Sequence, residues 1–148
     1  SSDSRRINQW KVENGVLISP KPGVNLITNE LFSDFKLHIE FRYPEGSNSG
    51  IYLRGRYEVQ VEDNYGRDPE STLFGGIYGF LTPNQMAAKK PWEWQSYDIT
   101  LIGRRVSIVA NGIKIINDQI REVFFNHIMR IGGEFYKIKS ASTQPNKK

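Results

Sequence analysis

The chain has 148 residues, with 20 Lys or Arg against 16 Asp or Glu for a formal net charge of +4, and it contains no cysteine. This length is enough for one domain with its own core, and the missing cysteines exclude disulfides, thiol nucleophiles and thiolate-bound metals. The basic residues are scattered in pairs, which argues against a nucleic-acid partner, and no apolar run reaches the roughly 20 residues of a membrane-inserted helix.

Short runs of alternating apolar and polar residues, separated by turn residues, follow one another along the chain and predict antiparallel strands. The first run, residues 10–18, is interrupted by Asn14-Gly15, a dipeptide favoured in hairpin turns because both residues tolerate positive φ. The second run, residues 35–43, predicts a strand with one buried face. Its solvent face carries Lys36, His38, Glu40 and Arg42.

Two further runs, residues 51–54 and 57–63, predict strands joined by a tight turn or bulge at Gly55-Arg56. With such a turn, the apolar side chains of both runs stay on the inner side. The polar side chains then project together on the outer side, namely Tyr52, Arg54, Glu58, Gln60 and Glu62.

The second half begins with a loop-rich stretch, residues 64–92, and a connection of this length is often functional. Residues 94–116 predict a three-stranded meander with a turn at Asn111-Gly112. We expect one short helix within residues 117–130 and a last strand at residues 135–139. Many short strands without intervening helices predict an all-β sandwich or barrel.

Several motifs occur in a fixed order along this pattern. They are Asn48-Ser49-Gly50-Ile51-Tyr52-Leu53-Arg54, Tyr57-Glu58-Val59-Gln60-Val61-Glu62-Asp63, Gly76-Ile77-Tyr78-Gly79, Trp94, Asn111-Gly112 and Phe135-Tyr136-Lys137-Ile138-Lys139. Their combination resembles the 3-keto-disaccharide hydrolase domain family, long catalogued as a domain of unknown function. The resemblance runs from about Trp10 to Lys139.

This resemblance implies a concanavalin-like jelly-roll sandwich of two antiparallel sheets, export to the periplasm or extracellular space of a bacterium, and a glycan or oxidised glycoside as ligand. We expect one domain at residues 10–139, with a flexible or edge segment at 1–9 and a flexible tail at 140–148. Two departures from the family are a shorter, more apolar segment at residues 118–133 and a reduced opening strand.

The candidate site is the polar side of the sheet, where side chains that hydrogen bond to sugar hydroxyls alternate with the core. Glu58 and Gln60 are the strongest candidates, because a two-residue step places both on one face about 7 Å apart. A polar solvent face is also normal for an antiparallel sheet, so alternation alone does not define a site. The predicted substrate-binding residues are Gln60, Tyr52, Arg42, Glu62, Tyr78, Asn48 and Trp92.

For a 3-keto glycoside, the resemblance implies elimination followed by addition of water. Glu58 or Asp63 would be the base, His38 or Glu40 the acid for the leaving oxygen, and Arg54 the cation that stabilises the enolate.

Two alternatives stay open. Glu58-x-Gln60-x-Glu62 resembles the catalytic strand of laminarinase-type glucanases, although carboxylates four residues apart on a regular strand lie about 13 Å apart by backbone, too far for a retaining pair. The other alternative is a lectin-like module that only binds glycans.

No metal or cofactor is expected. The chain has only two histidines, and we interpret His127 as structural. Calcium is conceivable at Glu62, Asp63, Asn64 and Asp68, but their spacing matches no known calcium loop. Trp94 is expected in the core.

Overall fold

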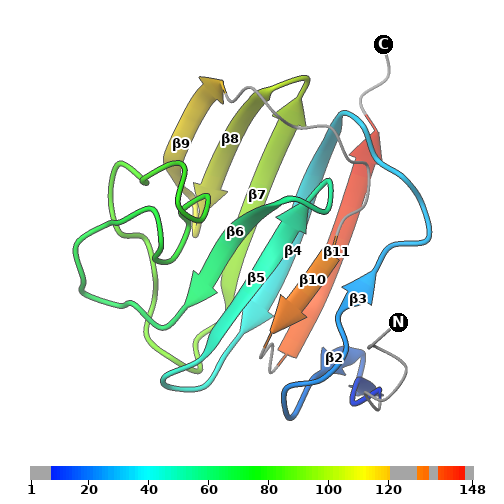
Figure 1. The fold of residues 1–148 in the computed structure, drawn as a ribbon. Coiled ribbons are helices and arrows are strands. Elements are labelled where there is room, and N and C mark those ends of the chain that lie inside the picture. The colour runs from blue at the N-terminus through cyan, green and yellow to red at the C-terminus, as the bar shows by residue number, and fades with distance from the viewer. Residues whose placement is uncertain (1–7, 121–129, 134–136, 146–148) are drawn as a thin grey trace.

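The computed structural model describes residues 8–120, 130–133 and 137–145, whose strands form two antiparallel sheets packed face to face (Figure 1). The seven-stranded sheet has the order β1-β2-β11-β4-β7-β8-β9, and the four-stranded sheet has the order β3-β10-β5-β6. The strands are β1 (Lys11–Glu13), β2 (Val16–Ile18), β3 (Leu26–Ile27), β4 (Phe35–Arg42), β5 (Asn48–Leu53), β6 (Tyr57–Glu62), β7 (Gln95–Ile102), β8 (Arg105–Ala110), β9 (Ile113–Ile120), β10 (Arg130–Gly133) and β11 (Lys137–Pro145). This arrangement confirms the predicted all-β jelly-roll class.

The core lies between the sheets and follows from strict alternation along the strands. In β4, every second residue from Phe35 to Phe41 is buried, and the residues between them are not. Phe41, Phe74 and Tyr97 meet at the centre, with ring centroids 5.0 Å apart for both Phe41–Tyr97 and Phe74–Tyr97. Because Phe74 comes from the connection between β6 and β7, that long segment is anchored in the core.

Both predicted Asn-Gly hairpin turns form. Asn14 and Gly15 have φ of 50° and 73°, and Asn111 and Gly112 have 51° and 80°, which is the left-handed pair that a type I′ turn requires. The β5–β6 turn is centred one residue earlier than predicted: Arg54 and Gly55 have φ of 49° and 69°.

Part of the long connection runs beside β6 like an additional strand. Gln60 N–H donates to Gly76 O over 2.9 Å, and Tyr78 N–H donates to Glu58 O over 2.9 Å. Val59 and Ile77 form an isolated bridge, and both side chains are buried. Tyr78 is therefore held directly beside Glu58 on the opposite, outward face.

The end of the chain differs from expectation. Residues 117–120 belong to β9 instead of starting a helix, while residues 121–129, including His127, lie outside the described residues. β11 continues to Pro145 between β2 and β4, so residues 140–145 form a strand where a flexible tail was expected. Within the described ranges there is no helix long and apolar enough to cross a membrane.

Candidate functional site

The predicted polar array is divided between the two faces of the sandwich. β4 belongs to the seven-stranded sheet and β5 and β6 to the four-stranded sheet, because the chain crosses from one sheet to the other at residues 43–47. His38, Glu40 and Arg42 therefore lie on one outer face, and Tyr52, Glu58 and Gln60 on the other. The expectation that they form one site is wrong.

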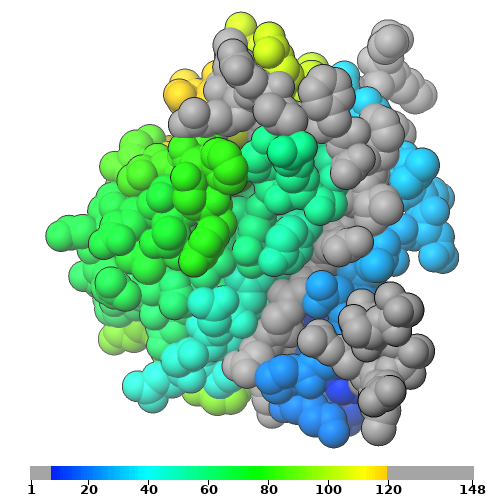
Figure 2. Space-filling model, in the orientation of Figure 1, coloured from blue at the N-terminus to red at the C-terminus, as the bar shows by residue number. Residues whose placement is uncertain are grey.

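The outer face of the four-stranded sheet carries a row of three neighbouring side chains, Tyr52, Glu58 and Tyr78. Tyr52 is the cross-strand partner of Glu58, and the backbone bond from Tyr78 fixes that residue on the other side of Glu58. Tyr78 is 48% exposed. In Figure 2, which views this face, the green surface of the β6–β7 connection stands beside the strands as a wall.

A glycine-rich row runs next to the Tyr52–Glu58–Tyr78 row. Gly50 pairs with Gln60 on one side and with Gly132 of β10 on the other, while Gly76 bonds to Gln60 from the connection. A Cβ atom on Gly50 would overlap the carboxyl group of Glu58, so this carboxyl lies over the Gly50 backbone. The absence of a side chain at Gly50 is what lets Glu58 take this position.

The surroundings of Glu58 make its carboxylate a stronger base than an exposed glutamate. Burial of its carboxyl raises the pKa of Glu58 above its ordinary value, and a hydrogen bond from Tyr52 partly opposes this shift. Desolvation disfavours the charged form of a carboxyl, which makes it a stronger base once it is ionised.

Gln60 lies on the same side of β6 as Glu58, but it is buried. Its side chain is only 1% exposed, and its Oε1 atom has no hydrogen-bond partner among the residues that the structure describes. Such an orphaned buried acceptor costs stability and is uncommon in native proteins. Glu62 and its partner Asn48, the next cross-strand pair along, lie at the solvent edge.

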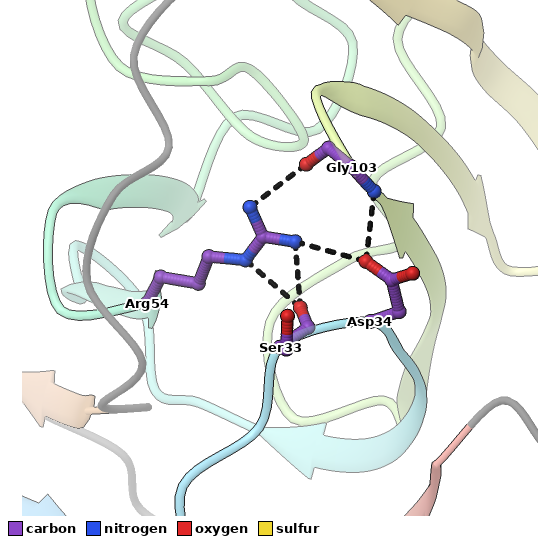
Figure 3. A network of polar contacts seen from close by, with 4 residues as sticks. All are labelled: Ser33, Asp34, Arg54 and Gly103. Atoms are coloured by element: carbon purple, nitrogen blue, oxygen red, sulfur yellow. Dashed lines mark hydrogen bonds and ion pairs between the residues drawn. The ribbon is translucent and has the colours of Figure 1, made fainter.

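Arg54 does not reach the site, contrary to its predicted role. Figure 3 shows its guanidinium directed to Ser33, Asp34 and Gly103. Nε and Nη2 donate to Ser33 O over 2.9 and 2.6 Å, Nη1 donates to Gly103 O over 2.8 Å, and Nη2 lies 3.3 Å from Asp34 Oδ1. The side chain is 5% exposed. Arg54 therefore joins the β5–β6 turn to the β7–β8 turn and to the start of β4.

Two side chains at the end of β6, the carboxylate of Asp63 and the carboxamide of Asn64, hold loops in place. Asp63 Oδ2 accepts from Gly46 N over 3.0 Å, and Asn64 Oδ1 accepts from Phe74 N over 2.8 Å. Asp63 thus caps the β4–β5 connection, and Asn64 is buried under the loop. In the described part of the chain, no group of three His, Cys, Asp or Glu side chains is placed to hold a metal ion.

The geometry of β6 bears on the glucanase alternative. The register of β5 and β6 runs without a shift from Asn48–Glu62 to Leu53–Tyr57. Glu58 and Glu62 therefore keep the regular strand separation of about 13 Å between backbones, and no bulge brings them together as a retaining pair requires.

The face of the seven-stranded sheet has its own charged cluster. His38 Nδ1 lies 2.7 Å from Asp98 Oδ1, and His38 Nε2 lies 3.5 Å from Glu40 Oε1. The bond to Asp98 is the largest cause of a raised pKa of His38. Asp98 was not among the predicted site residues, although alternation in residues 95–102 indicates that it faces outward. Its contact with His38 depends on the pairing of β4 with β7, which are distant in sequence.

The two tryptophans near β7 lie in different surroundings. Arg42 stacks over the ring of Trp94 with 5.1 Å between the guanidinium carbon and the ring centroid, and Trp94 is partly exposed instead of in the core. Trp92 is 50% exposed with a φ of 68°, and its N–H donates to Tyr43 O over 2.8 Å. Neither lies beside Glu58 in the sheet register.

Several solved structures share this two-sheet architecture with the chain. A Parabacteroides distasonis protein described as a candidate glycosyl hydrolase superposes with a TM-score of 0.80 at 25% identity, over 94% of this chain and 75% of that protein. A second such protein from the same organism gives 0.78 at 20% identity, over 93% and 90%. The carbohydrate-binding module CBM66 of Bacillus subtilis shares the fold, with a TM-score of 0.55 at 12% identity over 95% and 91%.

Among curated proteins, no sequence matches this chain significantly. The profile of the 3-keto-alpha-glucoside-1,2-lyase-like domain matches residues 2–139, which is nearly the whole chain. This match agrees with the order of motifs along β5, β6 and the connection that follows. The chain therefore belongs to the 3-keto-alpha-glucoside-1,2-lyase-like domain family.

Proposed function

We propose that this domain cleaves 3-keto glycosides on the outer face of the four-stranded sheet, with Glu58 as the catalytic base. The observation that carries the proposal is the position of the Glu58 carboxyl over Gly50, between Tyr52 and Tyr78, with a raised pKa. Family membership supplies the substrate class. A carbohydrate ligand also fits the candidate glycosyl hydrolases and the carbohydrate-binding module that share the fold.

The chemistry follows from the ketone. A carbonyl at C3 acidifies the hydrogen on C2, and Glu58 removes that proton to form an enolate. The enolate collapses to a C1–C2 double bond as the C1–oxygen bond breaks, and the electron pair leaves with the glycosidic oxygen, which takes the proton back from Glu58. Water then adds its hydroxyl to C1 and a proton to C2, so the net reaction is hydrolysis.

The two tyrosines have distinct roles in this proposal. The hydroxyl of Tyr52 donates to the Glu58 carboxylate and orients the base. Once Glu58 has taken the proton, the single O–H of Tyr52 turns to donate to the enolate oxygen. Tyr78 and Phe80 are about half exposed, at 48% and 52%, and offer ring faces on which a sugar can stack. With Arg54 held by backbone carbonyls elsewhere, stabilisation of the enolate comes from neutral donors.

The test compares a 3-keto disaccharide with its unoxidised parent, in heavy water and with an enzyme-free control for spontaneous exchange. We expect both sugars to be released only from the keto form, with deuterium at C2 of the keto product. Glu58→Gln should abolish release. Gly50→Ala, whose methyl group displaces the carboxyl, should lower the rate strongly while the protein stays folded. Cleavage of the parent, or keto product without deuterium at C2, would contradict elimination.

A second candidate function is glycan binding without turnover. The half-exposed rings of Tyr78 and Phe80 beside a polar sheet face favour it. Saturable binding of both disaccharides with no product from either would support this function over the enzymatic one.

A further inference from the structure

A cavity of about 270 Å³, half open to solvent, lies where the β6–β7 connection packs against β9, the edge strand of the larger sheet. In Figure 1, this is where the green connection approaches the gold strand. At ~30 Å³ for each liquid water, the space corresponds to about nine waters, which is enough for one sugar ring with its hydroxyls. Its aliphatic lining comes from Leu81, Ile115 and Ile116.

The rest of the lining is polar and uncharged. Thr82, Asn84, Asn117 and Gln119 contribute one hydroxyl and three carboxamides. Amides and hydroxyls both donate and accept hydrogen bonds, as the hydroxyls of a sugar do, while the aliphatic side chains suit the carbon face of the ring. No lining residue is charged, although the chain as a whole carries +4. The lining thus suits a neutral polyhydroxylated ligand better than an ionic one.

Irregular backbone in β9 shapes this lining. The pairing of β8 with β9 shifts twice, between Val106 and Ile108 and between Ile108 and Val109. Asp118 lies at the bulge with a φ of 48°, in the left-handed region that non-glycine residues rarely adopt. Its N–H donates to Ser107 Oγ over 2.9 Å, and its carboxylate pairs with Arg105 at 2.6 Å. Bulges of this kind re-aim side chains, here those on either side of Asp118.

Part of the polar lining is already positioned by the protein. Asn84 Nδ2 donates to Lys114 O over 3.1 Å, which ties the loop to β9, and Gln119 Nε2 donates to Asn117 O over 3.1 Å. These bonds fix two carboxamides. Their oxygens, the Asn117 carboxamide and the Thr82 hydroxyl make no hydrogen bond within the residues that the structure describes.

We propose that this cavity is a second binding site, specific for a single neutral sugar ring. It shares no lining residue with the Tyr52–Glu58–Tyr78 row, although the bond from Ile77 N to Leu81 O, 3.1 Å, links Leu81 of its lining to the residue before Tyr78. The site goes beyond the proposed cleavage, because it would hold a glycan on the domain without contacting Glu58.

The test titrates ¹⁵N-labelled protein with methyl α-D-glucopyranoside and follows backbone amide shifts. We expect saturable shifts at Asn84 and along residues 115–119, in the wild type and equally in Glu58→Gln. Asn117→Ala should weaken binding about three- to tenfold, the effect of one or two neutral hydrogen bonds. Gln85→Ala, which removes an exposed amide of the same loop outside the lining, should leave the affinity unchanged.

Thr82→Trp fills the cavity from an exposed position and should abolish the shifts while the rest of the spectrum stays that of the folded protein. Equal shifts with glucuronate would contradict specificity for a neutral ring. Absence of shifts at residues 115–119, or shifts confined to Tyr52, Glu58 and Tyr78, would overturn the second site. Because Glu58→Gln removes the proposed catalysis and leaves this cavity intact, failure of one proposal is distinguishable from failure of the other.

Discussion

Arg54 and Arg56 lie two residues apart in the β5–β6 turn, yet their environments are opposite. The guanidinium of Arg54 is buried among two carbonyls and Asp34, whereas Arg56 is exposed. A buried cation of this kind is costly to remove because its partners then lose their hydrogen bonds. We assign Arg54 to stability and not to chemistry.

This assignment predicts that Arg54→Met lowers the free energy of unfolding by about 2–4 kcal/mol. Arg56→Met, in the same turn, should change it by less than about 0.5 kcal/mol. Urea denaturation of the two variants measures the difference. Unchanged stability together with lost turnover in Arg54→Met would contradict this assignment and indicate a catalytic role for Arg54.

His38 predicts a pH dependence of stability. Its pKa is raised above 6.5, first by the hydrogen bond to Asp98 and further by Glu40. A raised folded pKa means that the contribution of His38 is fully present below the unfolded pKa and is lost as pH rises through the folded value. The side chain is 36% exposed, so solvent screens the interaction and the effect is small.

The measurement is the difference in unfolding free energy between wild type and His38→Gln at about pH 5.5 and about pH 8.5, either side of the His titration. We expect the wild type to be favoured more at the acidic value. A difference that is constant, or larger at the alkaline value, would contradict the cluster with Asp98 and Glu40.

At the scale of elements, the two Asn-Gly hairpins have the same backbone and different neighbours. Asn111 Oδ1 accepts from Ser96 N over 2.9 Å, and its Nδ2 donates to Ala87 O over 2.8 Å, so this turn also holds the end of the long connection. Asn14 is exposed, and its side chain makes no hydrogen bond with any described residue. Only one of the two turns organises the segment that carries Tyr78.

Asn111→Gly and Asn14→Gly therefore form a matched pair, since glycine tolerates the positive φ at both positions. We expect Asn111→Gly to lower the free energy of unfolding by about 1–3 kcal/mol through its lost hydrogen bonds, and Asn14→Gly to cost only a few tenths of a kcal/mol. Thermal and urea denaturation check this. Equal losses would show that turn conformation alone matters.

Local elements were predictable from sequence, and pairings between distant elements were not. Alternation identified the buried side of β4, β5 and β6, and Asn-Gly dipeptides identified two turns, because both depend on neighbouring residues. Nothing local indicates that β4 pairs with β7 and β11 instead of β5. Of the stretch 117–130, within which one short helix was expected, residues 117–120 belong to β9, and the apolar spacing that suggested the helix runs from Ile120 into residues 121–129, outside the described residues.

At the scale of the molecule, the sandwich presents two chemically different faces. Glu58 lies over a glycine between two tyrosines on the smaller sheet, while Glu40 belongs to the ion-paired cluster of His38 on the larger sheet. We expected both carboxylates in one site. Alternation shows which side chains of a strand face solvent, but it does not show to which of the two sheets the strand belongs. Because the two carboxylates lie on opposite faces, the same Glu→Gln change at each position tests which face carries the chemistry.

The most direct measurement is turnover of a 3-keto disaccharide by Glu58→Gln and Glu40→Gln, with folding of both variants verified by circular dichroism. The same change of carboxylate to carboxamide is made on opposite faces of the sandwich. We predict that Glu58→Gln loses activity by at least about a hundredfold, the usual worth of a general base, while Glu40→Gln retains it. Loss of activity in Glu40→Gln with retention in Glu58→Gln would place the chemistry on the seven-stranded sheet and contradict this account.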